Sequence, residues 1–218
     1  VPEILSAEAK KRDIGLIHIS TDYVFGKDNC GPYKHDSQKN PCNFYGLTKS
    51  FGEEAVLKFC KNSTIIRIAS VFSCYGDNFV KKIFNLIVNQ NEINVINDQY
   101  ISLTNAKIFA QNIPQFIKIN CINRDIQSED LKIIHFTNFN YTTWYEVSLV
   151  ILDELKIIDK NVNCIINPIT SKNWKSNALR PGDSRLVLDH DLLKKNDIIN
   201  ESWEISVRNT VRELYNNN

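Results

Sequence analysis

An apolar run between two segments of helical spacing limits the fold more than any other feature of this sequence. Residues 16–19 are Leu-Ile-His-Ile, which follow Gly15 and are typical of a parallel strand buried on both faces. Apolar residues recur at helical spacing over residues 3–12 and again from Tyr45 onward. Residues 63–69 predict a second strand. Because helix and strand alternate, we expect a doubly wound parallel sheet of the α/β class with right-handed crossovers.

Beyond Ser70 the pattern changes, and shorter elements replace the regular alternation. Apolar spacing and helix caps predict four further helices, with short strands between them and an irregular stretch before the last helix. The predicted helices cover residues 79–89, 104–117, 143–155 and 203–215, the predicted strands cover 94–96, 132–136 and a short stretch after Asn163, and the irregular stretch runs through Pro181.

The start of the helix at Tyr45 carries a pair of side chains suited to proton transfer. Tyr45 and Lys49 are separated by one helical turn, so a helix places both on one face. Free tyrosine, with a pKa of about 10, is a poor acid at neutral pH. A neighbouring ammonium stabilises the phenolate and makes proton transfer efficient in the working pH range. Thr21, at the carboxyl end of the preceding strand, is placed to bind the same substrate oxygen, so we predict a carbonyl reductase site.

A second tyrosine, Tyr23, shows that this spacing alone has little specificity. It also has a lysine four positions later, Lys27. Tyr23 lies where a strand ends and a loop begins. This loop contains Gly26 and Gly31, so no helix is expected there. Only the pair that begins at Tyr45 follows a chain breaker and opens a helical run.

Longer motifs surround these residues and repeat the pattern of a known family. Residues 20–26 read S-T-D-Y-V-F-G, and residues 41–53 fit P-x-x-x-Y-G-x-x-K-x-x-G-E. Further segments are G-D-N-F from Gly76, V-I-N-D-Q-Y from Val95, Y-T-T-W from Tyr141 and R-P-G-D-S-R-L from Arg180. In order and spacing they resemble the dTDP-4-dehydrorhamnose reductase family, a branch of the extended short-chain dehydrogenase/reductases, over nearly the whole chain.

The resemblance implies a role for each matching residue. Thr21, Tyr45 and Lys49 would be catalytic, with Tyr45 protonating the C4 carbonyl oxygen as NADPH or NADH supplies hydride. Lys49 and Tyr45 would also bind the cofactor, and Thr21, Tyr23 and Asn78 would bind the sugar. Arg180 precedes a proline in an irregular polar stretch, where its planar guanidinium suits a diphosphate clamp; a surface salt bridge is the alternative. The expected product is dTDP-L-rhamnose.

The resemblance also implies how the chain divides. Residues 1–71 would be the carboxyl-terminal part of a Rossmann-type NAD(P)-binding sheet, and residues 72–218 mainly a smaller mixed lobe for the sugar nucleotide, with some elements returning to the sheet. The sequence holds no G-x-G-x-x-G or G-x-x-G-x-x-G turn and no methionine. By comparison with the family, we expect a Gly-rich half of about 80–90 residues upstream, without which the chain would be inactive.

Charge and cysteine content exclude several classes of protein. The 26 basic and 25 acidic residues are interspersed and leave a net charge of +1, so we expect no nucleic-acid partner and no membrane association. No apolar run approaches the length of a membrane span. Six cysteines without C-x-x-C pairs predict reduced thiols in a cytoplasmic protein and no metal site. The expected partner is a dTDP-sugar; a homodimer and a separate amino-terminal half stay open.

Two departures from the family pattern leave the substrate open. Ser70 stands where the family usually has tryptophan, and Ile101 stands where it has glycine, in a loop that we expect to border the active site. Another nucleotide-sugar reductase or epimerase, or a non-catalytic regulatory subunit with a reductase-like fold, are therefore alternatives. Trp144 is expected to pack the second lobe and not to reach the site.

Overall fold

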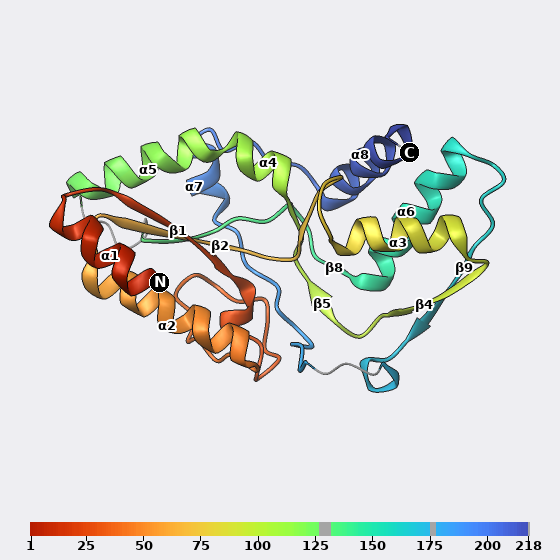
Figure 1. The fold of residues 1–218 in the computed structure, drawn as a ribbon, viewed down its shortest axis with the longest axis horizontal. Coiled ribbons are helices and arrows are strands. Elements are labelled where there is room, and N and C mark those ends of the chain that lie inside the picture. Colours follow the sequence, from red (N-terminus) through yellow and green to blue (C-terminus); the bar gives the residue numbers. More distant parts are fainter. Residues whose placement is uncertain (127–131, 175–177, 218) are drawn as a thin grey trace.

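The computed structural model describes residues 1–126, 132–174 and 178–217. In Figure 1 the chain forms two halves that lie side by side, one built on a parallel sheet and the other dominated by helices. The chain enters the sheet half first, crosses to the helical half after the second strand, and later returns to the sheet.

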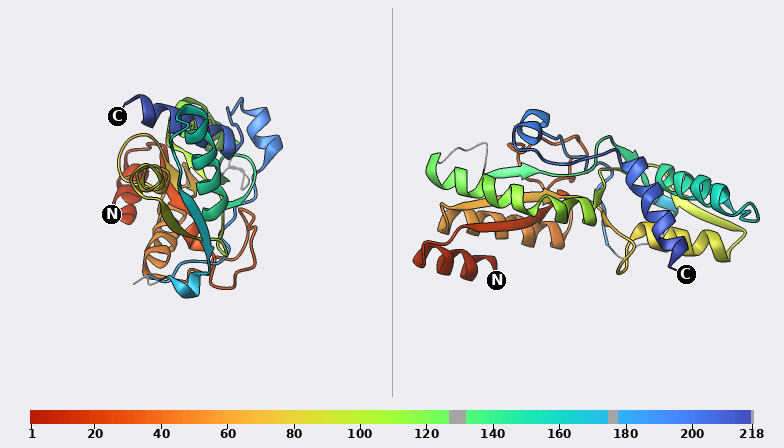
Figure 2. Two further views of the ribbon diagram at one scale, coloured as in Figure 1. Left: turned by 90° about the vertical axis from the view of Figure 1, so that its right-hand side faces the viewer. Right: turned by 90° about the horizontal axis from the view of Figure 1, so that it is seen from above.

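The sheet half confirms the predicted parallel α/β arrangement. Its strands are β1 (Leu16–Thr21), β2 (Ser63–Ile68) and β7 (Ile133–His135), parallel and in the order β1-β2-β7. Figure 2 shows α1 (Pro2–Lys11) and α2 (Phe44–Phe59) on one side of the sheet and α5 (Ile113–Ile126) on the other. Thr21 pairs with Ile68 in this register, so the carboxyl ends of β1 and β2 meet at one edge.

Strand β1 is less buried than the sequence predicts. The first residues of β2 are fully buried, whereas Leu16 to Ile19 of β1 are only half-buried. The expectation of a strand buried on both faces is therefore wrong for β1. The physical reason is its position, because within the described part of the chain β1 is hydrogen-bonded to β2 on one side and to no strand on the other.

The helical half packs three amphipathic helices around small strand pairs. Its helices are α3 (Phe79–Asn89), α6 (Trp144–Ile158) and α8 (Trp203–Asn216). The strand pairs are parallel β4 (Glu92–Ile96) with β9 (Ile165–Ile169), parallel β3 (Val71–Phe72) with β6 (Thr104–Asn105), and antiparallel β5 (Tyr100–Ile101) with β8 (Thr142–Thr143). Their buried side chains form one continuous core.

The segment predicted as one helix over residues 104–117 is helical for the most part, but it begins as a strand and is broken once. The segment is strand β6, then α4 (Ala106–Gln111), then α5, with a break at Asn112. The Asn112 side chain donates to the Ile108 and Ile199 carbonyls and accepts from the Ile199 amide, so a distant segment holds the break in place. Helix α7 (His190–Lys195) was not predicted.

Helix α5 and strand β7 lie in the sheet half although they follow residue 72. The division at residue 71 itself stays a prediction.

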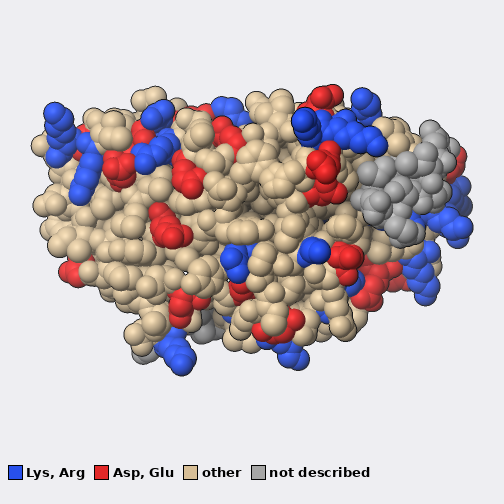
Figure 3. Space-filling model, turned by 180° about the vertical axis from the view of Figure 1, so that it is seen from behind, with Lys and Arg blue, Asp and Glu red and all other residues tan. Residues whose placement is uncertain are grey.

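The surface shows no concentration of one charge on the face drawn in Figure 3, where acidic and basic side chains are interspersed. None of the helices in the described ranges is long and apolar enough to cross a membrane. Nor do the described residues include a group of three or more His, Cys, Asp or Glu side chains that could hold a metal ion.

Candidate active site

A cavity of about 820 Å³ opens where the carboxyl ends of β1 and β2 face the helical half. It collects five of the six residues that the sequence singles out: Thr21, Tyr23, Tyr45, Lys49 and Arg180. These residues come from the end of β1, the start of α2 and the segment before Pro181. In open α/β sheets, ligands bind outside the carboxyl ends of the strands, which is where this cavity lies.

The amino terminus of α2 is held at the cavity by its cap. The Asn43 side chain accepts a hydrogen bond from the Gly46 amide at 2.8 Å. Its own amide group donates to the Leu179 carbonyl at 2.9 Å, which ties the start of the helix to the segment that carries Arg180. The cap thus fixes the position of Tyr45, whose side chain is 54% exposed and meets the Tyr23 ring edge-on with 6.0 Å between centroids.

Lys49 connects α2 to the end of β1. Its ammonium group donates to the Ile19 carbonyl at 2.8 Å. Burial lowers the pKa of this ammonium, and the Glu53 carboxylate one turn further on opposes that shift. One hydrogen of the ammonium therefore holds the helix on the sheet, and the other two make no hydrogen bond to the described residues, which leaves them for a ligand.

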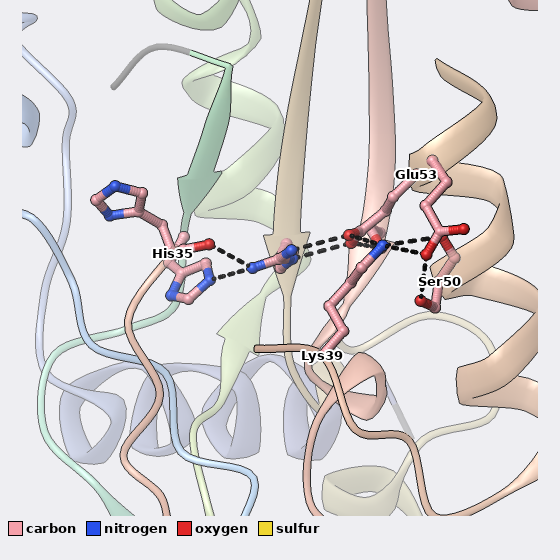
Figure 4. Close-up of polar contacts among 8 residues, drawn as sticks. His35, Lys39, Ser50 and Glu53 are labelled. Atoms are coloured by element: carbon pink, nitrogen blue, oxygen red, sulfur yellow. Dashed lines mark hydrogen bonds and ion pairs between the residues drawn. The ribbon is translucent and has the colours of Figure 1, made fainter. Parts of the chain in front are cut away.

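A buried ion pair fixes the same helix further along. Arg67, on β2, makes a two-pronged contact with Glu53, Nε to Oε1 at 2.9 Å and Nη2 to Oε2 at 2.8 Å. The Ser20 hydroxyl donates to Glu53 Oε1 at 2.5 Å, and Arg67 Nη1 donates to the His35 carbonyl at 2.9 Å. Figure 4 shows this cluster, in which Lys39 also approaches Glu53.

The cluster extends to the third strand through His135, whose Nε2 lies 3.3 Å from Arg67 Nη1. Burial and the Arg67 charge lower the pKa of His135 to about 3, so this side chain is neutral at physiological pH. The cluster therefore ties α2 to all three strands of the sheet.

Two substrate-binding candidates have different surroundings. Tyr23 is half-buried in the cavity wall, and burial, with the Asp22 carboxylate beside it, raises its pKa to about 12. Arg180 is exposed and lines both this cavity and an adjoining one of about 330 Å³. Phe79, Trp144 and Trp174 contribute aromatic walls to the smaller cavity. Arg180 thus lies at the junction of the two cavities.

Asn78 is separate from these residues. Its side chain caps α3 by accepting from the Lys81 amide at 3.1 Å, and it donates to the carbonyls of Ser73 and Tyr75. It lines another cavity, away from Thr21 and Tyr45. A contact of Asn78 with the sugar stays a prediction that these bonds do not favour.

Trp144 lines the cavity, contrary to the expectation that it only packs the second lobe. Its indole donates to Gln99 at 3.1 Å and its ring packs on Phe79 at the edge of both cavities. Ser70 lines the cavity as well, with a positive φ of 40°. Ile101, by contrast, is buried in the core of the helical half as part of β5, so the expectation that it borders the site is wrong.

A parallel sheet with a threonine at a strand end, and a tyrosine and lysine one turn apart on the next helix, defines the class of the short-chain dehydrogenase/reductases. Comparison narrows this class: the chain belongs to the RmlD substrate-binding domain family, whose model matches residues 1–216.

Two curated relatives illustrate the likeness, both dTDP-4-dehydrorhamnose reductases. The Salmonella typhimurium protein is 28% identical over 98% of this chain and 70% of its own length. The Sinorhizobium fredii protein is 30% identical over 97% of this chain and 70% of its own length. The chain thus spans about 70% of either relative.

Solved structures of the same kind of enzyme share the fold. A dTDP-4-dehydrorhamnose reductase from Clostridium acetobutylicum superposes with a TM-score of 0.83 at 25% identity, over 98% of this chain and 71% of that one. The Bacillus anthracis enzyme, solved with NADP, gives 0.76 at 25% identity, over 97% and 70%.

Gly46 sits where α2 touches the backbone of Tyr23, and a matched glycine allows a test of that contact. A Cβ at Gly46 would lie 2.0 Å from the Tyr23 carbonyl oxygen. We expect Gly46→Ala to lower the free energy of unfolding by about 1–3 kcal/mol, because the backbone must move apart. Gly52→Ala, whose Cβ would meet the Pro2 ring at 3.2 Å and His18 Nε2 at 3.7 Å but no backbone atom, should be far less destabilising. Urea denaturation of both variants measures the difference; equal stability would contradict the close contact.

Proposed function

We propose that the protein reduces the 4-keto group of dTDP-4-dehydro-6-deoxy-L-mannose to give dTDP-L-rhamnose, in the cytoplasm, with NADPH or NADH. The observation that carries the proposal is the gathering of Thr21, Tyr45 and Lys49 around one cavity at the carboxyl ends of the sheet. The relatives named above support the choice of substrate, and the structure solved with NADP supports the choice of cofactor.

In this proposal Tyr45 gives its phenolic proton to the ketone oxygen. A reduced nicotinamide, when bound, supplies the hydride that reaches C4. Lys49 has two ammonium hydrogens left after its bond to Ile19, which fit the hydroxyls of a nicotinamide ribose. Its positive charge stabilises the phenolate that remains on Tyr45 until a proton returns from solvent. Thr21, at the end of β1, faces the same substrate oxygen.

The pyrophosphate of the cofactor needs donors that this sequence does not hold, since it contains no Gly-rich turn. We propose that a nucleotide-binding half meets the free edge of β1. That edge is unpaired within the described ranges, and apolar side chains near it, Ile4, Leu5 and Ile14, are exposed. An added parallel strand would pair with β1 and cover these side chains.

The proposed function can be tested by measuring turnover after residues 1–218 have been supplied with a nucleotide-binding half; we call the result the complemented protein. Residues 1–218 would be joined to, or mixed with, the part of the Salmonella relative that lies outside the matched region. Oxidation of NADPH that depends on the dTDP-4-keto sugar is the expected result. An epimerase would return its cofactor unchanged, so interconversion of a UDP-sugar without net NADPH oxidation would favour that alternative. No turnover with any nucleotide sugar would favour a regulatory subunit.

Arg180 provides a test of substrate binding that needs no cofactor. Because Arg180 lines both cavities, we expect Arg180→Ala to weaken binding of a dTDP-sugar to residues 1–218 by about tenfold or more, the loss of one charge-assisted hydrogen bond. Titration calorimetry measures the change. Arg12→Ala, at an exposed residue of the Arg12–Glu8 pair on α1, is the matched control and should bind normally. Equal affinities would remove Arg180 from the diphosphate site.

A further inference from the structure

The carboxylate of Asp22 is buried in the cavity wall beside Thr21. Asp22 is 2% exposed and is one of the residues that line the cavity. One oxygen, Oδ1, accepts the Thr21 hydroxyl at 3.0 Å. The other, Oδ2, is buried and makes no hydrogen bond of normal geometry in the described part of the chain, although the Ser184 hydroxyl is close enough to lower the pKa of the carboxyl. A buried carboxylate with one oxygen unsatisfied is costly unless it carries a proton or has a task in the site.

The hydrogen bonds that Thr21 already makes leave only one lone pair of its hydroxyl oxygen for the substrate. A hydroxyl has one hydrogen and two lone pairs. The Tyr23 amide donates to one lone pair at 3.2 Å, and the hydrogen goes to Asp22. What remains is a lone pair, which can accept a hydrogen bond but cannot donate one. A ketone oxygen also only accepts, so Thr21 cannot bind it while Asp22 is ionised.

We propose that Asp22 is a positioning residue that decides whether the Thr21 hydroxyl donates or accepts a hydrogen bond in the cavity. A proton on Asp22 reverses the bond between the two side chains, because the carboxylic acid then donates to the Thr21 oxygen. Both lone pairs of Thr21 are used in that state, and its hydrogen is released toward the cavity. The ketone oxygen can then accept from both Thr21 and Tyr45. An alcohol at the same place both donates and accepts, so it binds in either state.

The surroundings of Asp22 extend its protonated form up to about pH 6, so that the ionised form dominates at neutral pH. Burial raises the pKa of Asp22 to about 6, against the effect of the Ser184 and Thr21 hydroxyls, which lower it. The titratable groups beside the carboxylate are the Tyr23 phenol and the Cys42 thiol, and burial, with the Asp22 charge, raises the pKa of each. Both are neutral at physiological pH. Among the described residues, Lys49 and Arg180 are the cations that line the same cavity, and Tyr45 is a further phenol there.

The test compares ketone and alcohol binding to residues 1–218 as pH changes. It rests on the proposed function, so the probes are the dTDP-4-keto-6-deoxy sugar and dTDP-L-rhamnose, titrated by calorimetry between pH 5 and 8. Between these limits the affinity for the ketone should fall about tenfold, the value of one lost hydrogen bond, with a midpoint near the Asp22 pKa. The affinity for the alcohol should change little.

Asp22→Asn separates positioning from a structural role. The amide group can donate to Thr21 as the acid does, so the variant should bind the ketone equally well at pH 5 and at pH 8. A purely structural role predicts weaker binding of both ligands at every pH. Thr21→Val should bind the ketone at pH 5 only as weakly as the wild type does at pH 8. If the affinity of Asp22→Asn for the ketone, relative to its affinity for the alcohol, still falls as pH rises, the proposal is overturned.

A second measurement distinguishes failure of this proposal from failure of the proposed function. Carboxyl-carbon NMR of protein labelled at aspartate should show a resonance that titrates near pH 6 and is missing in Asp22→Asn. If neither dTDP-sugar binds but this resonance is present, the substrate is wrong and Asp22 still controls Thr21. If the Asp22 resonance titrates near the ordinary aspartate value of about 4, the proposal fails whatever the substrate is.

Discussion

Tyr45→Phe should lower turnover by about 10² or more in the complemented protein while leaving affinity for the nucleotide sugar nearly unchanged. The phenolic proton acts only in the transition state, where it neutralises the charge that grows on the ketone oxygen. Binding of the ground state depends on other contacts, among them Arg180 at the junction of the two cavities. Steady-state kinetics with the dTDP-4-keto sugar and NADPH measures both quantities.

Tyr23→Phe is the matched control for this prediction. Tyr23 lies against Tyr45 in the same cavity, and its pKa of about 12 makes its phenol a weaker acid than an ordinary tyrosine. We expect its removal to change turnover less than tenfold. If the two variants lose turnover equally, or if Tyr45→Phe keeps wild-type turnover, the assignment of the proton to Tyr45 is wrong.

Local sequence was sufficient to predict that Thr21, Tyr45 and Lys49 lie together, although their roles stay a prediction. The apolar run at residues 16–19 fixes where β1 ends, and so where Thr21 stands. The turn between Tyr45 and Lys49 fixes their shared helix face. Because the carboxyl end of β1 and the amino end of α2 are adjacent in a parallel α/β unit, these three side chains line one cavity.

The features that local sequence could not predict depend on contacts between residues that are far apart in the chain. The break at Asn112 depends on its bonds to Ile199, far along the chain. By sequence alone, an asparagine at position 78 fits a contact with a sugar and a helix cap equally well. In the structure its side chain caps α3. Asp22 follows Thr21 in the motif, but its burial depends on packing that sequence alone does not reveal. Helix caps can be predicted from position, whereas burial of a polar side chain requires the tertiary fold.

The ion pair between Glu53 and Arg67 is buried inside the sheet half. Both residues are almost completely buried, at 0% and 1% exposure. Each oxygen of Glu53 accepts from Arg67, and the Ser20 hydroxyl adds a further bond. A carboxylate so placed is costly to leave alone, because no water can solvate it. Hydrogen bonds from Arg67, and its charge, outweigh burial and lower the pKa of Glu53.

Arg67→Met is therefore expected to lower the free energy of unfolding by about 3–5 kcal/mol, most of it from the unpaired Glu53 charge that remains. The double variant Glu53→Met with Arg67→Met should recover most of that loss, because two apolar side chains of similar length replace the pair. Lys39→Met is the control, since Lys39 is partly exposed and 3.7 Å from Glu53, and should cost about 1 kcal/mol or less. Urea denaturation at pH 7 measures all three variants. If the double variant is as unstable as Arg67→Met, mutual neutralisation of charge is not the main contribution of the pair. The pair would then stabilise the protein through packing and through its hydrogen bonds to Ser20 and His35.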